Sequence, residues 1–297
     1  MLINEAALAA LYTGFKAVYS QGFQGADSRY AEVAMTVPSS TGENAYGWLG
    51  QLPRIREWIG PRHVRSLSAY GYKIANRKFE LTVAVPRENI EDDTVGVFTP
   101  LFSEMGRSSA NHPDELLFGL LSSGFSEACY DGQNFFDTDH PGAIVDGAPV
   151  SISNMQAGAG EPWFLLDTSR AIKPLIWQTR TDYKLTALNN EGDENVFFRD
   201  EFVYGVRARV NAGFGLWQLA FGSKGELNAT TYAAARAAMS AMRGDEGTPL
   251  GIKPDTLVVG PALEEAALQL LNAERTADDT SNVWKGTAKL IISPWLA

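Results

Sequence analysis

The sequence contains few of the residues that build covalent or metal-based scaffolds. Its 297 residues include one cysteine, Cys129, and three histidines, His63, His112 and His140. A single cysteine excludes an internal disulfide, and three scattered histidines cannot form a His-rich metal cage. We therefore expect side-chain packing alone to hold the fold together, with no metal and no cofactor.

Long apolar runs and an excess of basic charge are also absent. No run approaches the ~20 residues that a membrane-spanning helix needs, and the N-terminus lacks the basic region and apolar block of a signal peptide. Lys and Arg number 25 against 35 Asp and Glu, so the net charge is −10. These features predict synthesis in the cytoplasm without a membrane partner, and they argue against a chain that binds nucleic acid over its whole surface.

Recognisable catalytic motifs are missing as well. The sequence has no Gly-x-Ser-x-Gly elbow, Walker loop, His-Glu-x-x-His or Cys-x-x-Cys. One stretch could offer ligands to a divalent cation, through Asp131, Asp137, Asp139 and His140. However, Asp before Gly and His before Pro are typical of turns, and we favour a turn. Cys129 has no histidine near it in sequence and is predicted to be a small buried residue.

Hydrophobic periodicity predicts a mixture of helices and strands with no internal repeat. Helices are predicted over 4–20, capped by Asn4 and ended by Gly22 and Gly25, and over 98–123, 228–243 and 263–272. The second is predicted to be one long helix kinked at Pro113, with His112 on its apolar face. Strands are predicted over 30–37, 79–85, 163–166, 175–178, 196–198, 202–210, 216–221, 256–259 and 288–292. Residues 142–161 and 189–194 are predicted to be a surface loop and a hairpin tip.

Residues 51–79 form a strongly basic segment. Seven Lys and Arg stand against Glu57, so the segment carries +6 and leaves −16 for the rest of the chain. It cannot bury a core of its own and is predicted to be a long two-stranded excursion that lies on something else. Arginines interleaved with aromatics would suit a nucleic-acid patch. Because the remainder of the chain is acidic, we favour an interaction arm that docks on a neighbouring copy.

Seven short blocks, in order, resemble one family of proteins. They are NAYGWLG at 44–50, EWIG at 57–60, GYKIAN at 71–76, EMGR at 104–107, PDEL at 113–116, YDGQNFF at 130–136 and IISPWL at 291–296. Together they resemble the major head subunits of Mu-like phages and prophages, which have the Hong Kong ninety-seven-type fold of tailed-phage capsid proteins.

The resemblance implies an α+β fold with five parts. Residues 1–38 would form an N-terminal arm and 39–82 an extended β-hairpin loop. Residues 83–124 would supply the strand and long spine helix of a peripheral domain, and 125–285 a mixed α/β axial domain. Residues 286–297 would form a C-terminal strand that returns to the peripheral side.

The resemblance also implies a structural protein and not an enzyme. Many copies would assemble, as pentamers and hexamers, into the icosahedral head shell of a tailed phage, around packaged double-stranded DNA that is enclosed without sequence-specific binding. Beyond the chain itself, the implied partners are scaffold, protease and portal proteins, with a decoration protein as a further candidate. The implied location is the virion, and the host cytoplasm during assembly.

The charge pattern predicts which residues dock the loop on the acidic spine of a neighbour. Six are basic and two are apolar anchors: Arg54, Arg56, Arg62, Arg65, Arg77, Lys78, Trp48 and Trp58. Two other functions stay open at this stage. One is a soluble hydrolase that uses carboxylates such as Asp131 and Asp137, and the other is a DNA-binding accessory protein. Particle size separates the enzyme from the shell protein, since an enzyme should run as a small oligomer. The DNA-binding alternative requires salt-sensitive binding of naked DNA by the isolated basic segment.

Overall fold

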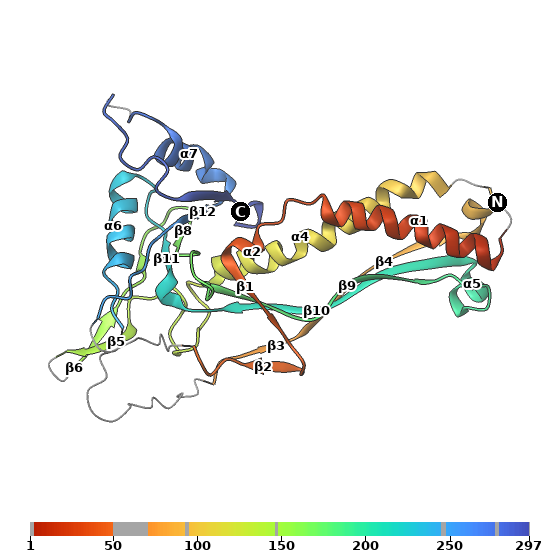
Figure 1. The fold of residues 1–297 in the computed structure, drawn as a ribbon, viewed down its shortest axis with the longest axis horizontal. Coiled ribbons are helices and arrows are strands. Elements are labelled where there is room, and N and C mark those ends of the chain that lie inside the picture. The colour runs from red at the N-terminus through yellow and green to blue at the C-terminus, as the bar shows by residue number, and fades with distance from the viewer. Residues whose placement is uncertain are drawn as a thin grey trace.

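The computed structural model describes residues 3–49, 71–92, 95–145, 148–244, 248–276 and 279–296. Figure 1 shows an elongated part, in which two long helices lie along a sheet, joined to a second part that is built around another sheet. None of the described helices is long and apolar enough to cross a membrane.

The two long helices, α1 (Glu5–Gln24) and α4 (Thr99–Ser123), pack directly against each other. The Asn4 side chain accepts a hydrogen bond from the amide of Ala7, as its cap position predicts. Pro113 lies inside α4, which remains one helix. The helix α1 continues through Gly22, contrary to our prediction, because a glycine there lets its backbone lie against that of α4; Gly25 is the C-cap.

The elongated part contains a four-stranded sheet in the order β1-β9-β10-β4. Its strands are β1 (Ala34–Pro38), β9 (Leu175–Leu188), β10 (Glu201–Phe214) and β4 (Arg77–Pro86). The two long strands β9 and β10 are antiparallel, as are β10 and β4, whereas β1 is parallel to β9. Alternate residues of β10, among them Phe202, Tyr204 and Val206, are buried in a core shared with α1 and α4. The opposite face of the sheet therefore points away from these helices.

The second part contains a five-stranded sheet in the order β13-β12-β8-β11-β7. Its strands are β13 (Lys289–Ile292), β12 (Thr256–Val259), β8 (Trp163–Leu166), β11 (Ala220–Ser223) and β7 (Met155–Gln156). All residues of β8, β11 and β12 are buried, and the apolar run of β12 predicts this for that strand. The helices α6 (Ala229–Ser240) and α7 (Glu264–Asn272) lie beside this sheet (Figure 1).

The C-terminal strand β13 pairs with β12 in this second sheet and has no pairing with the sheet of the elongated part. The short helix that follows it, η4 (Pro294–Leu296), does contact α4. The return of the chain toward the long helix is therefore made by the last turn of the chain and not by the strand.

The remaining elements are short. They are α2 (Tyr30–Val33), the pair β2 (Glu43–Ala45) and β3 (Lys73–Ala75), α3 (Arg87–Glu91), η1 (Val95–Phe98), the pair β5 (His140–Val145) and β6 (Ala148–Ile152), α5 (Glu194–Arg199), η2 (Trp217–Leu219) and η3 (Pro261–Leu263).

Several predicted elements differ from the observed ones. The strand predicted over 196–198 is the helix α5, because Asn195 donates hydrogen bonds to the carbonyls of Leu188 and Glu201 and so bridges the ends of β9 and β10. Asp200 ends α5 in the left-handed region, with φ 54°. The loop predicted over 142–161 contains most of β5 and all of β6 and β7. Residues 30–33 and 217–219 are helical turns and not strand.

Candidate assembly surfaces

The predicted docking residues fall into two groups. Arg54, Arg56, Trp58, Arg62 and Arg65 lie outside the described residues, whereas Trp48, Arg77 and Lys78 lie within them. The Trp48 ring meets Tyr46 at 6.2 Å between centroids and packs partly against the chain's own core. The Arg77 guanidinium lies 5.2 Å from the centre of the Phe79 ring.

The loop that joins β2 to β3 is rooted firmly in the long sheet. The buried Gln178 amide of β9 accepts a hydrogen bond from Tyr46 Oη at 2.8 Å and donates one to the Ile74 carbonyl at 3.0 Å. Tyr72 Oη accepts a hydrogen bond from the amide of Phe214, and burial raises the pKa of this phenol to about 12. Both ends of the loop are thereby held at defined positions on the sheet.

The elbow between α1 and β1 is held at both ends by side chains from other elements. The buried Asp114 carboxylate of α4 accepts hydrogen bonds from the amides of Arg29 and Tyr30 and from Ser28 Oγ. At the other end of α2, the Lys173 ammonium donates to two carbonyl oxygens, those of Ala31 and Glu32, each at 2.7 Å. These bonds satisfy backbone groups at the ends of a four-residue helix that could not persist alone.

The far end of the β9–β10 hairpin is apolar and exposed. The side chains of Phe197 and Phe198 on α5 are 78% and 73% exposed, and their rings form an edge-to-face pair 5.1 Å apart. Figure 1 shows α5 at one end of the elongated part, away from the second sheet. Two adjacent phenylalanines in water are typical of a surface that another molecule covers.

This end of the sheet also carries a concentration of acidic charge. The predicted partner of the basic loop was an acidic spine helix, but α4 has three carboxylates, of which Asp114 is buried and Glu104 is paired with Arg107. By contrast, residues 87–92 and 189–201 hold eight carboxylates and two arginines, a net charge of −6. We call these two segments, which contain α3 and α5, the acidic tip.

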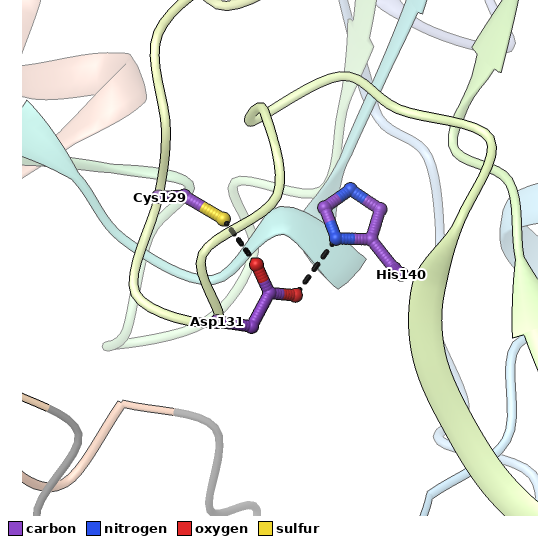
Figure 2. Close-up of side chains that lie close together, drawn as sticks. All are labelled: Cys129, Asp131 and His140. Atoms are coloured by element: carbon purple, nitrogen blue, oxygen red, sulfur yellow. Dashed lines mark hydrogen bonds and ion pairs between the residues drawn. The ribbon is translucent and has the colours of Figure 1, made fainter. Parts of the chain in front are cut away.

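Figure 2 shows a compact polar cluster in the second part, formed by Cys129, Asp131 and His140. The carboxylate lies between the other two groups: Cys129 Sγ donates to Oδ1 at 3.0 Å, and His140 Nδ1 lies 2.8 Å from Oδ2. The His140 side chain is fully buried, and its ring stacks on Trp217 with 3.9 Å between centroids. Because an ionised carboxylate only accepts hydrogen bonds, the proton between Asp131 and His140 is on Nδ1.

These three side chains are the group that could hold a metal ion within the described part of the chain. Two ligands of one tetrahedral zinc ion lie about 3.3–3.5 Å apart, given Zn–N and Zn–O near 2.0 Å and Zn–S near 2.3 Å. The observed 2.8 and 3.0 Å are shorter and match direct hydrogen bonds. The cluster therefore fits a hydrogen-bonded clamp better than a metal site.

The protonation of the cluster supports the same interpretation. Burial raises the pKa of the Cys129 thiol, and the adjacent Asp131 carboxylate raises it further. Burial alone would raise the pKa of Asp131, but the hydrogen bonds from His140 and Cys129 outweigh it and hold that pKa below its usual range. A protonated thiol that donates to a carboxylate is a poor nucleophile.

Comparison with known proteins gives the family. A model of the Mu-like prophage major head subunit gpT matches residues 8–296. The major capsid protein of Escherichia phage Mu is 43% identical over 305 aligned residues, with both chains fully covered. The Mu-like prophage FluMu major head subunit of Haemophilus influenzae is 45% identical over 97% of each chain.

The chain belongs to the Mu-like major head subunit family.

Solved structures agree with this family. A chain of the bacteriophage JBD30 procapsid has a TM-score of 0.88 at 45% identity, with 99% of this chain and 100% of that chain covered. A chain of the JBD30 capsid has a TM-score of 0.79 at 33% identity, with both chains fully covered. The predicted Hong Kong ninety-seven-type α+β capsid fold is confirmed.

As a Mu-like major head subunit, the protein is a structural capsid protein and not an enzyme, as predicted. The alternative of a carboxylate hydrolase has no support in these relatives. The geometry agrees, because Asp131 is occupied by Cys129 and His140, and Asp137 accepts hydrogen bonds from the amides of Asn134 and Thr138.

Several residues that position the arm and the loop carry no signal in the local sequence. Gln178, Asp114 and Lys173 act on segments more than 80 residues away in sequence, so no local pattern marks them. The apolar pattern predicts that Phe197 and Phe198 belong to a strand, whereas the acidic residues just before them, Asp193 and Glu194, are typical of a helix N-terminus.

Proposed function

We propose that copies of this chain assemble, as pentamers and hexamers, into the icosahedral head shell of a tailed phage or prophage, around packaged double-stranded DNA. The observation that supports this most strongly is the full-length similarity to the JBD30 procapsid chain. The net charge of −10 suits a container, since a net-negative wall repels packaged DNA and does not hold it.

We also propose which part of the capsid fold each stretch of the chain forms. Residues 1–38 form the arm, 39–82 the extended loop, 83–124 the strand and spine helix of the peripheral domain, and 125–285 the axial domain, with 286–297 as the closing segment. The strand pairing adds a refinement: β9 and β10 begin and end in the axial part of the sequence but build most of the peripheral sheet.

The loop is proposed to reach over a neighbouring subunit and dock through Arg54, Arg56, Arg62, Arg65, Arg77 and Lys78, with Trp48 and Trp58 as apolar anchors. Its firm root at Gln178 and Tyr72 supports this role, because a fixed root aims a long excursion outward. The surface area that arms and loops bury when they wrap around a neighbouring subunit would add to the area buried in flat contacts between subunits.

Further partners follow from the same proposal. Scaffold, protease and portal proteins would act during assembly in the host cytoplasm, and the finished shell would be part of the virion. One JBD30 capsid structure is described as decorated with minor capsid protein trimers, and its chain has a TM-score of 0.78 to this one. An equivalent decoration protein is proposed for this shell.

Electron microscopy and sedimentation of the expressed chain, alone and with a candidate scaffold, test the proposal. We expect megadalton particles or free pentamers and hexamers. Changing Arg54, Arg56 and Arg62 to Glu should abolish particles at low salt, whereas Lys16→Glu, a charge reversal on an exposed residue of α1, should not. A chain that forms neither megadalton particles nor pentamers and hexamers under any of these conditions would refute the shell. Intact assembly of the triple variant would refute the electrostatic docking of the loop.

A further inference from the structure

One face of the long sheet carries a cluster of basic side chains that have no acidic partners among the described residues. The residues of β10 that alternate with its buried ones include Arg207 and Arg209. In the strand register, Arg207 lies opposite Lys184 of β9, and Arg209 lies opposite Lys78 of β4. All four side chains therefore project from the face of the sheet that points away from α1 and α4. We call this set the basic face.

The described part of a single chain leaves the basic face electrostatically uncompensated. Among the described residues, no carboxylate lies within ion-pair distance of Lys78, Lys184, Arg207 or Arg209, and the buried Arg209 Nε has no hydrogen-bond partner. Glu80 lies opposite Arg207 in the register, but its carboxylate accepts a hydrogen bond from Thr82 Oγ1 at 2.6 Å. Like charges directly opposite one another in a sheet are destabilising, so this surface is suited to an anionic partner.

The acidic tip supplies the opposite charge on the same sheet, but it is too far away to neutralise the basic face within one chain. Lys78 is eight positions along β4 from Pro86, which directly precedes the tip, a distance of about 27 Å at roughly 3.4 Å per residue. Lys184 is five positions along β9 from Asn189, where the tip begins, a distance of about 17 Å on the same basis. The Debye length is about 8–10 Å at 0.10–0.15 M salt, so the two surfaces hardly interact through solvent. They also lie on one continuous sheet and cannot fold onto each other.

We infer that the acidic tip of one copy docks on the basic face of a second copy. This inference rests on the proposed self-assembly and names the surfaces that carry one of its contacts. The basic face has a net charge of +3 when Glu80 is included, and the tip has −6. The exposed Phe197 and Phe198 at the tip add an apolar contact that excludes water around the charges. Because the two surfaces differ, the contact is heterologous and generates rings or extended arrays.

Charge reversal on each surface, and on both together, tests the contact. A face variant, K78E/K184E/R207E, changes the face from +3 to −3, and a tip variant, E88K/D92K/E191K/E194K, changes the tip from −6 to +2. All seven side chains are exposed, so both variants should fold, which circular dichroism and thermal melting can verify. The control is Lys16→Glu.

We expect each variant alone to lower the yield of particles at low salt at least tenfold, as measured by sedimentation and electron microscopy. The chain that carries all seven changes should recover assembly to within a few-fold of the wild type, because complementarity is restored with the signs exchanged. Recovery is the decisive result, since a merely damaged surface would not regain function when a second surface is altered.

Three results would overturn the inference. In the first, the face variant and the tip variant both assemble like the wild type. In the second, both variants fail to assemble, and the chain with all seven changes folds but also fails to assemble. In the third, the face variant forms normal empty shells that do not retain DNA, which would show that the basic face contacts nucleic acid. In each case a wild-type chain that still forms particles leaves the proposed function intact. A wild-type chain that forms neither particles nor free pentamers and hexamers, alone or with a candidate scaffold, would refute the proposed function itself.

Discussion

The contact between α1 and α4 makes a sharp prediction about two glycines. A methyl group on Gly106 would lie 2.7 Å from the amide nitrogen of Phe23 and closer still to the Tyr19 carbonyl oxygen. A methyl group on Gly22 would meet the carbonyl group of Ser103 in the same way. Non-bonded heavy atoms settle about 3.5–4.0 Å apart, so either alanine would force the helices to separate by roughly 1 Å.

The expected loss follows from two opposing effects. Overpacking of this kind costs about 1–3 kcal/mol, and the upper end applies because backbone atoms cannot move to another rotamer. Alanine in place of glycine in a helix returns about 1 kcal/mol. We therefore expect Gly106→Ala and Gly22→Ala each to lower the free energy of unfolding of the unassembled subunit by about 2 kcal/mol.

Each helix contains its own control. Gly14 in α1 and Gly119 in α4 have no heavy atom within 4 Å of the position of an added methyl group. Gly14→Ala and Gly119→Ala should therefore raise stability by up to about 1 kcal/mol. Thermal melting should separate the two pairs of variants by several degrees, at roughly 2–4 °C per kcal/mol. If Gly106→Ala melts at the same temperature as Gly119→Ala, the close approach of the two helices is wrong.

Three further predictions concern the polar cluster and the hairpin tip. Asp131→Asn should lower the free energy of unfolding at pH 7 by about 1.5–3 kcal/mol. Hydrogen bonds hold the pKa of Asp131 below 3.8, so the stability that its carboxylate contributes is complete above about pH 4 and is lost as the pH falls through the folded-state pKa. In chemical denaturation, the difference in unfolding free energy between the wild type and Asp131→Asn should therefore be smaller at pH 3 than at pH 7. An equal difference at both pH values would contradict the assigned bonds. Cys129 should react with a thiol reagent only after unfolding, and fast labelling of the folded subunit would show that its thiol is accessible. Replacing Phe197 and Phe198 by Ser should leave the melting temperature of the subunit unchanged but reduce its self-association in sedimentation, and a large drop in melting temperature would show that these rings belong to the core of the chain.

Much of the architecture could be predicted from local patterns. The apolar spacing around Phe102 and Met105 predicts α4 with nearly the observed bounds, and the continuous apolar runs predict β8 and β12 residue for residue. These elements are predictable because α4 buries one face and the two strands are buried on both faces. The spacing of apolar residues in the sequence therefore matches the spacing of buried positions in the structure.

The candidate site was less predictable, because its groups come together only through tertiary structure. Cys129 has no histidine beside it in sequence, yet Asp131 connects it to His140 in space. The prediction that Cys129 is buried is confirmed, but the clamp itself depends on how the turn at residues 130–136 folds back.

The sequence by itself determined that this chain has no internal disulfide, that packing builds its core, and that basic charge is concentrated in one segment. These are properties of composition and local order, which folding does not change. Tertiary structure alone decided where the charges meet. Lys78, Lys184 and Arg207 come from three strands, with at least 22 residues between any two of these side chains in sequence, and only the register of β4, β9 and β10 brings them to one face. Strand register depends on which side chains are buried together, so it is set by the assembled core and not by any one segment.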